Sequence, residues 1–126
     1  MSAQTTPDVH VVVVDDDAPV RRALGRLLTA AGCRVSLCGS AEDFLVKSYD
    51  LAPTCVVLDV HLPRLSGLDL RALLGRLDKR LPIVFITADH EVARSAEMRQ
   101  SGHPCLIKPV DDEVLLRAIS QASGQA

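Results

Sequence analysis

Acidic residues directly follow two apolar runs that have the character of buried strands. The run Val9–Val14 leads into the three aspartates Asp15–Asp17, and the run Cys55–Leu58 leads into Asp59. Short, continuous apolar runs rich in β-branched residues are typical of strands buried in a parallel sheet. The carboxyl ends of such strands meet at one edge of the sheet, where open α/β proteins bind their ligands. We therefore expect these carboxylates to lie close together.

Two further apolar runs end on polar groups of other kinds. Ile83–Ile86 precedes Thr87, and Cys105–Ile107 precedes Lys108. Clustered carboxylates repel one another, by about 4 kcal/mol for two charges about 4 Å apart at an effective dielectric constant of about 20. Such a cluster holds protons or binds a cation, and carboxylate oxygens suit Mg²⁺. With an ammonium and a hydroxyl added, the set predicts a phosphoryl-group site with a carboxylate as candidate nucleophile.

Stretches with helical spacing of apolar residues separate these runs, and Arg34–Cys38 predicts one more short strand. Asp17 is a candidate N-cap and Pro19 suits a first helical turn, so a helix is expected to follow them. The other expected helices run from Ser40 to about Lys47, from after Gly67 to near Lys79-Arg80, over Asp89–Gln100, and from Asp111-Asp112 onward. Five strand–helix alternations with short links predict an α/β fold, a parallel sheet covered by helices on both faces.

Composition limits the class of protein. A chain of 126 residues predicts one domain, over 1–126 with an ordered core at about 8–123. The net charge is −2 and only three residues are aromatic, so direct nucleic-acid binding is not expected. No apolar stretch approaches the roughly 20 residues that span a bilayer, and the N-terminus lacks a signal-peptide pattern. We expect a cytoplasmic protein without a membrane segment.

The cysteines and histidines do not predict a metal centre of the zinc type. Cys33, Cys38, Cys55 and Cys105 form no CxxC pair, and the four histidines have no metal-ligand spacing. Small, buried apolar side chains in a reducing compartment are the better interpretation of these cysteines.

The motifs that carry this chemistry also occur together in one known family. The stretches VVVVDDD, VVLDVHLPRLSGLDL, VFITAD and IKPV follow one another along the chain. In order and spacing the sequence resembles the receiver domain of two-component response regulators. The resemblance implies a flavodoxin-like (βα)5 three-layer sandwich with five parallel strands in the order 2-1-3-4-5. It also implies a phosphorelay signalling function, not that of an enzyme.

Carried over position by position, the resemblance implies roles for the acidic cluster. Asp59 would accept a phosphoryl group from a sensor histidine kinase or a histidine phosphotransfer protein. Asp15 and Asp16 would hold Mg²⁺, with Asp59 and the backbone carbonyl of His61 completing the protein ligands.

The same resemblance implies roles for residues around the acids. Lys108 would contact the phosphoryl oxygens, and Thr87 would move toward the phosphoryl group and transmit the change. His61, Ala88 and Asp89 lie where the family tunes dephosphorylation, so they are expected to set the lifetime of the phosphorylated state. The bond between Lys108 and its following proline is expected to be cis.

The sequence departs from the family at Cys105, where receivers usually carry Tyr or Phe. The family couples movement of the threonine to rotation of that aromatic ring, so this chain cannot switch in that way. A downstream protein target, or an output domain absent from this chain, is implied as a further partner. The resemblance also implies that the domain could dimerise through the face formed by the fourth helix, the fifth strand and the last helix.

Three other functions compete with this interpretation. A degenerate receiver would serve only as an interaction module, with the fold intact but no phosphate chemistry. A phosphatase of the haloacid dehalogenase type also places an aspartate nucleophile after a buried strand, but Pro19 stands where its motif requires Thr or Val. A dinucleotide-binding protein needs a glycine-rich turn after the first strand, and this chain has DDDAPV there instead.

Overall fold

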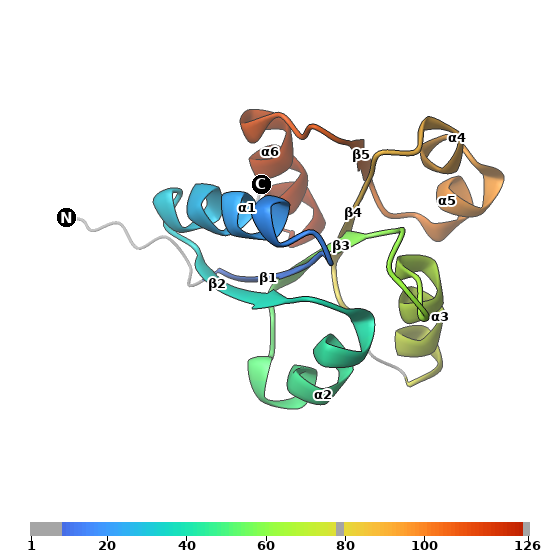
Figure 1. Cartoon of the computed structure of the whole chain (residues 1–126), viewed down its shortest axis with the longest axis horizontal. Coiled ribbons are helices and arrows are strands. Elements are labelled where there is room, and N and C mark those ends of the chain that lie inside the picture. The colour runs from blue at the N-terminus through green and yellow to red at the C-terminus, as the bar shows by residue number, and fades with distance from the viewer. Residues whose placement is uncertain (1–8, 78–79, 125–126) are drawn as a thin grey trace.

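A computed structural model describes residues 9–77 and 80–124 as a five-stranded sheet with helices between the strands (Figure 1). Every neighbouring pair of strands is parallel, and their order is β2-β1-β3-β4-β5. The fold class and the strand order expected from the resemblance are confirmed. In chain order the elements are β1 (His10–Val14), α1 (Ala18–Ala30), β2 (Arg34–Cys38), α2 (Ala41–Leu51), β3 (Cys55–Asp59), α3 (Gly67–Arg76), β4 (Ile83–Thr87), α4 (His90–Ala93), α5 (Ala96–Ser101), β5 (Cys105–Ile107) and α6 (Asp112–Ala122).

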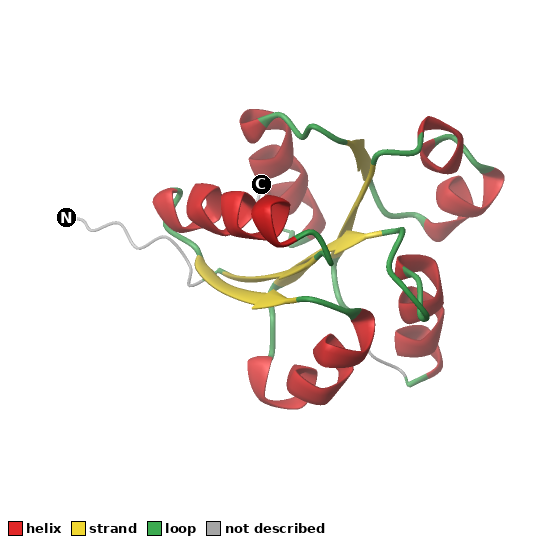
Figure 2. Cartoon of the chain, viewed as in Figure 1, coloured by secondary structure: helices red, strands yellow, loops and turns green. Residues whose placement is uncertain are grey.

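The helices cover both faces of the sheet, which gives three layers (Figure 2). On one face, Leu24 and Leu28 of α1 pack with Leu115 and Ile119 of α6 against alternate strand residues. On the other face, side chains from α2, α3, α4 and α5 pack against the remaining strand residues. Strands β1, β3 and β4 are buried along their whole length, because helices cover them on both sides.

The helix starts follow from local capping chemistry. The Asp17 side chain accepts a hydrogen bond from Val20 N at 3.2 Å, so Asp17 is the N-cap of α1 as predicted. Ser40 caps α2 in the same way, and α2 continues to Leu51, four residues beyond the expected end at Lys47. Helix α3 ends at Arg76 with Leu77 as its C-cap, so it is shorter than the predicted helix that ends near Lys79-Arg80. Lys79 itself and the predicted domain limits at 1 and 126 lie outside the described residues.

The prediction of one helix over Asp89–Gln100 is wrong, because the segment forms two short helices. Helix α4 ends at Ala93, and Ser95 adopts an extended conformation. The Ser95 hydroxyl then accepts a hydrogen bond from Met98 N at 3.0 Å and starts α5 as a new N-cap. Met98 of α5 is only 2% exposed and packs in the apolar cluster of this face, so α5 has its own core contact.

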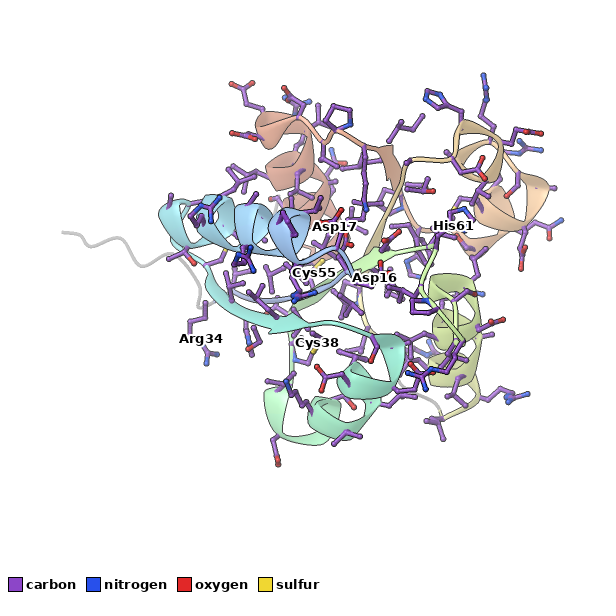
Figure 3. All side chains as sticks on the ribbon, in the orientation of Figure 1. Asp16, Asp17, Arg34, Cys38, Cys55 and His61 are labelled. Carbon is purple, nitrogen blue, oxygen red and sulfur yellow. The ribbon has the colours of Figure 1, made fainter. Side chains whose placement is uncertain are left out.

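The two labelled strand cysteines lie on opposite faces of the sheet (Figure 3). Cys38 belongs to the apolar cluster under α2, whereas Cys55 belongs to the cluster under α1 and α6. All four cysteines are free thiols, and burial raises the pKa of the Cys55 thiol to about 12. These thiols are therefore apolar packing groups rather than nucleophiles. Within the described ranges, no helix has the length and hydropathy needed to cross a bilayer.

Candidate functional site

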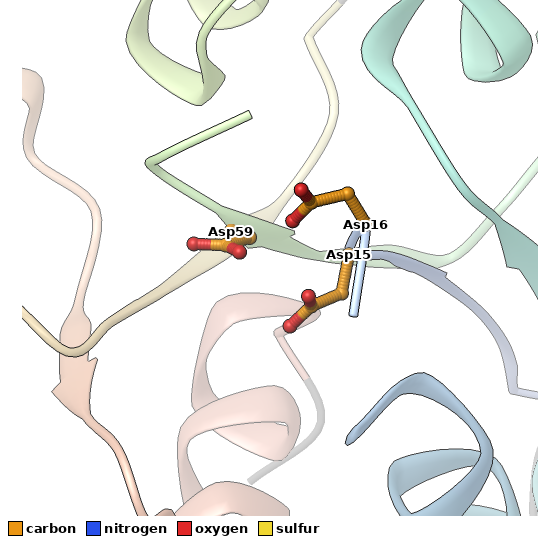
Figure 4. A group of neighbouring side chains, drawn as sticks. All are labelled: Asp15, Asp16 and Asp59. Carbon is orange, nitrogen blue, oxygen red and sulfur yellow. The ribbon is translucent and has the colours of Figure 1, made fainter. Parts of the chain in front are cut away.

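The three acidic residues Asp15, Asp16 and Asp59 converge at the carboxyl end of the sheet (Figure 4). One oxygen from each carboxylate lies within 4.8 Å of the others. Asp59 is the last residue of β3, and Asp15 directly follows the neighbouring strand β1. Asp15 and Asp59 are buried and Asp16 is exposed, so the cluster opens to solvent on one side.

Lys108 brings a positive charge to the two buried acids. Its Nζ lies 2.9 Å from Asp15 Oδ2 and 3.3 Å from Asp59 Oδ2. The lysine immediately follows β5, and its backbone N donates a hydrogen bond to the Thr87 carbonyl at 2.9 Å. Burial would lower the pKa of Lys108, but its contacts with Asp15 and Asp59 outweigh this and raise it. Lys108 is therefore a cation held between the two acids.

The ionised form of Asp59 is disfavoured by its surroundings. Burial, followed by the neighbouring charge of Asp15, raises the pKa of Asp59 to about 6. Lys108 and a hydrogen bond from His61 N to Asp59 Oδ1 at 3.1 Å act in the opposite direction. An additional positive charge beside Asp59 would therefore stabilise its ionised form.

The raised pKa makes a prediction about stability in the absence of metal. The ionised Asp59 destabilises the fold above the pKa of an unfolded aspartate, increasingly as the pH rises from about 4 to about 6. Asp59→Asn is therefore expected to raise the free energy of unfolding by about 1 to 2 kcal/mol at pH 8, after discounting for solvent screening. At pH 5 the gain should be about half as large. Urea unfolding of the wild type and Asp59→Asn in the presence of a chelator measures this difference. Equal stability of the two proteins at pH 8 would show that the ionised Asp59 does not destabilise the fold.

A series of contacts connects Thr87, through Asp89, to His61. Thr87 is fully buried, and its hydroxyl oxygen accepts a hydrogen bond from Asp89 N at 3.0 Å. The Asp89 carboxylate accepts from Glu91 N and Val92 N at the start of α4, and these bonds lower its pKa. Its Oδ2 also lies 3.3 Å from His61 Nε2. Two of the three expected tuning positions, His61 and Asp89, therefore contact each other, and the third, Ala88, is exposed between Thr87 and Asp89.

The structure also places two residues in the site that the sequence analysis did not single out. Arg21 on α1 donates from Nη1 to the Asp15 carbonyl at 2.6 Å. Gly67, the first residue of α3, comes so close to β3 that a Cβ atom there would lie 2.5 Å from the Asp59 carbonyl oxygen. In the sequence, Gly67 marks only the point after which a helix is expected. No spacing rule indicates either contact, because both depend on how α1 and α3 pack on the sheet.

Two further predictions concern the first residue of β5 and the segment that follows this strand. The Lys108–Pro109 peptide bond is cis, as expected. Cys105 pairs with Phe85 of β4 in the sheet, and burial raises the pKa of its thiol. Its side chain is half-buried against the apolar cluster that contains Phe85 and Met98, so it acts as a small packing group.

The residues in the cluster fit a divalent cation. Asp15 Oδ2 is buried without a hydrogen-bond partner of good geometry, its close contact being the ion pair with Lys108. The three carboxylates and one ammonium leave a formal charge of −2, which a divalent cation would balance. All the available ligand atoms are oxygens, which hard cations prefer.

Comparison with known proteins agrees with this geometry. The family model for the response regulator receiver domain matches residues 11–120. This chain belongs to the receiver domain family. It is a receiver domain of two-component signalling, with the acidic site typical of phosphoacceptor receivers, and is a signalling module rather than a catalytic enzyme. The phosphatase and dinucleotide-binding interpretations are therefore excluded.

Individual relatives resemble this receiver domain along most of its length. Nodulation protein W of Bradyrhizobium diazoefficiens is 39% identical over 90% of the chain, and Transcriptional regulatory protein FixJ of Rhizobium meliloti is 37% identical over 92%. The chain covers 50% and 57% of these proteins, so it spans about half the length of the curated relatives that it matches. Among solved structures, FixJ-N superposes with a TM-score of 0.86 at 34% identity, over 96% of this chain and 98% of that one.

Proposed function

We propose that the receiver domain accepts a phosphoryl group on Asp59. One observation carries this proposal: the Asp59 carboxylate stands at a strand end between an ammonium 3.3 Å away and two further carboxylates. A phosphoryl group transferred to Asp59 would lie beside Lys108, which could donate to the phosphoryl oxygens. The degenerate-receiver interpretation predicts that this geometry has no phosphate chemistry.

The proposed transfer forms one bond and breaks one bond. A carboxylate oxygen of Asp59 attacks phosphorus while the P–N bond of a phosphohistidine breaks, and the leaving imidazole takes up a proton. With acetyl phosphate as donor, a P–O bond breaks and acetate leaves. Asp59 must be ionised for this attack, and the positive charge of Lys108 favours the ionised form.

We infer that Asp15, Asp16 and Asp59 hold Mg²⁺ with the backbone carbonyl of His61. When bound, Mg²⁺ would supply positive charge to the transferring phosphoryl oxygens. Asp15 is kept in position by a hydrogen bond from Asp17 N at 2.9 Å, so one ligand is oriented in advance. Asp16 is exposed and can adjust to the ion.

Thr87 and Lys108 would respond to the phosphoryl group. The Thr87 hydroxyl accepts from Asp89 N, which leaves its own proton available for donation to a phosphoryl oxygen. Movement of Thr87 would disturb the Asp89 cap at the start of α4. This route would carry the signal toward α4 without the aromatic residue that Cys105 replaces.

The proposed partners follow from the family. A sensor histidine kinase or histidine phosphotransfer protein would donate the phosphoryl group, and a target protein or an output domain would receive the signal. We infer that residues from about 8 to 123 fold as one domain. The chain covers 57% of Transcriptional regulatory protein FixJ of Rhizobium meliloti, so we propose that the output region is carried either by a longer protein or by a separate target. The switching surface would comprise α4, α5, β5 and α6, and dimerisation through it is part of the proposal.

Small-molecule phosphodonors test the function directly. Wild type and Asp59→Asn are incubated with Mg²⁺ and acetyl phosphate, and their intact masses are recorded. A phosphoryl adduct is expected on the wild type only. If no adduct forms and beryllofluoride also fails to bind, the interaction-module interpretation replaces this proposal.

The contact between His61 and Asp89 makes a prediction about the lifetime of the phosphorylated state. His61→Ala removes the 3.3 Å contact between His61 Nε2 and Asp89 Oδ2. Loss of the imidazole would change how water reaches the acyl phosphate. An exposed contact of this kind is weak, so we expect the rate of phosphoryl loss to change by no more than about fivefold. His90→Ala, which removes the exposed histidine that directly follows Asp89, is the matched control. Unchanged phosphoryl loss in His61→Ala would contradict the tuning role.

A further inference from the structure

A cavity lies at the opposite end of the sheet from Asp59. It has a volume of about 350 Å³ and lies between α3, the residues that lead into β4 and the residue two before β5. Pro82 and Ile83 at the entry of β4 line it, whereas Thr87 ends the same strand at the phosphoryl site. The cavity is therefore separate from the acidic cluster, and none of the residues proposed for phosphoryl transfer lines it.

The polar side chains that line this cavity, among the described residues, are cationic or able to become so. Arg71, Arg80 and His103 line it, and no acidic residue is among the lining residues in the described part of the chain. The acidic site at the other end of the sheet has the opposite charge. A cavity with this lining attracts an anion.

Two of these groups are already held in position. Arg71 Nη2 donates to the Ser101 carbonyl at 3.1 Å, which fixes one side of its guanidinium and leaves other N–H groups for a ligand. The His103 ring packs edge-to-face on Phe85, with ring centroids 5.9 Å apart. Burial, followed by the charge of Arg71, lowers the pKa of His103. An anion placed between the two would oppose that effect.

The remaining wall is apolar. Leu74, Leu81 and Pro82 line the cavity beside the cationic groups, and a Cβ atom at Gly75 would meet nothing within 4 Å. Pockets of about 300 Å³ or more with apolar walls and a few polar groups are the usual form of small-molecule sites. An inorganic anion alone would leave the apolar wall without contacts.

We propose that this cavity binds a small organic acid, with its carboxylate at Arg71 and His103 and its apolar tail against Leu74 and Leu81. Arg80, exposed at the rim, adds to the attraction. Since Arg71 joins α3 to the end of α5 through Ser101, an occupied site would also hold these two helices together. The phosphoryl-transfer proposal does not require this site.

The experiment uses hexanoate as probe and NMR of the full chain as readout. Saturable shifts of the His103 ring and the Leu74 and Leu81 methyl signals are expected, with a rise in the pKa of His103. Hexanamide, which has the same tail without charge, should bind at least about tenfold more weakly, as should inorganic phosphate, which lacks the tail. Equal binding of hexanamide would overturn the anionic assignment, and equal binding of phosphate would overturn the apolar part.

Three variants separate binding at the site from general charge effects. Arg71→Gln is expected to weaken hexanoate binding about tenfold, whereas Arg76→Gln, an exposed arginine on the same helix outside the cavity, should leave it unchanged. Gly75→Leu should fill the cavity while favouring the helix, so the protein folds and hexanoate no longer binds. Absence of saturable shifts in the wild type, equal effects of Arg71→Gln and Arg76→Gln, or normal binding by Gly75→Leu would each refute the proposal.

Discussion

Asp15→Asn is expected to reduce the affinity for Mg²⁺ by about 100-fold or more and to slow phosphorylation by acetyl phosphate at fixed Mg²⁺ to a comparable extent. The substitution keeps the shape of the side chain and removes one of the two buried carboxylates of the cluster. It also removes the negative charge that Lys108 Nζ contacts at 2.9 Å, so that Asp59 becomes the remaining carboxylate partner described for this lysine. Calorimetric titration with Mg²⁺ measures the loss of affinity.

The neighbouring aspartate provides the matched control for this prediction. Asp17 also follows β1, but its side chain caps α1 and is exposed. Because Asn is about as good an N-cap as Asp, Asp17→Asn should keep both the fold and the Mg²⁺ affinity within about twofold. Wild-type Mg²⁺ binding by Asp15→Asn, or equal losses in both variants, would contradict the assignment of Asp15 as a ligand.

Gly67→Ala is expected to destabilise the protein by about 2 to 4 kcal/mol and to impair phosphorylation. The added Cβ atom would lie 2.5 Å from the Asp59 carbonyl oxygen and 3.0 Å from Val60 Cα. Both are backbone atoms that pairing with β4 holds in place, so neither can move without displacing the proposed phosphoacceptor. Urea unfolding followed by circular dichroism measures the change in stability.

Gly75 is the control because it lies in the same helix without such neighbours. A Cβ atom there meets nothing within 4 Å, so Gly75→Ala should stabilise the protein by about 0.5 to 1 kcal/mol through helix propensity alone. If Gly67→Ala is as stable as Gly75→Ala, then the close approach of α3 to β3 does not constrain the site.

Most of the fold could be predicted because its signals are local. The buried strands consist of short β-branched runs, and the helices between them begin at capping residues such as Ser40 and Asp111. The strand order came from the resemblance alone, since alternation of strands and helices does not specify it. The break between α4 and α5 was missed because Ser95 is a modest helix former, and its capping bond became evident only in three dimensions.

The site was predictable in part for the same reason. Parallel strands bring their carboxyl ends together, so Asp15, Asp59 and Lys108 could be placed near one another from their positions after apolar runs. The contact of His61 with Asp89 and the approach of Gly67 to β3 depend on loop paths and helix packing, which no short-range pattern encodes. The cationic cavity combines Arg71 and His103, 32 positions apart in the sequence, and was missed for that reason.

The most direct test of the central proposal locates the phosphoryl group on the chain. The wild-type protein is phosphorylated with acetyl phosphate and Mg²⁺, reduced with borohydride, digested and sequenced by mass spectrometry. Borohydride converts an aspartyl phosphate to homoserine, so the account predicts homoserine at position 59 in the phosphorylated sample alone. Homoserine at Asp15 or Asp16 instead, or aspartate at all three positions after reduction of a proven adduct, would contradict it.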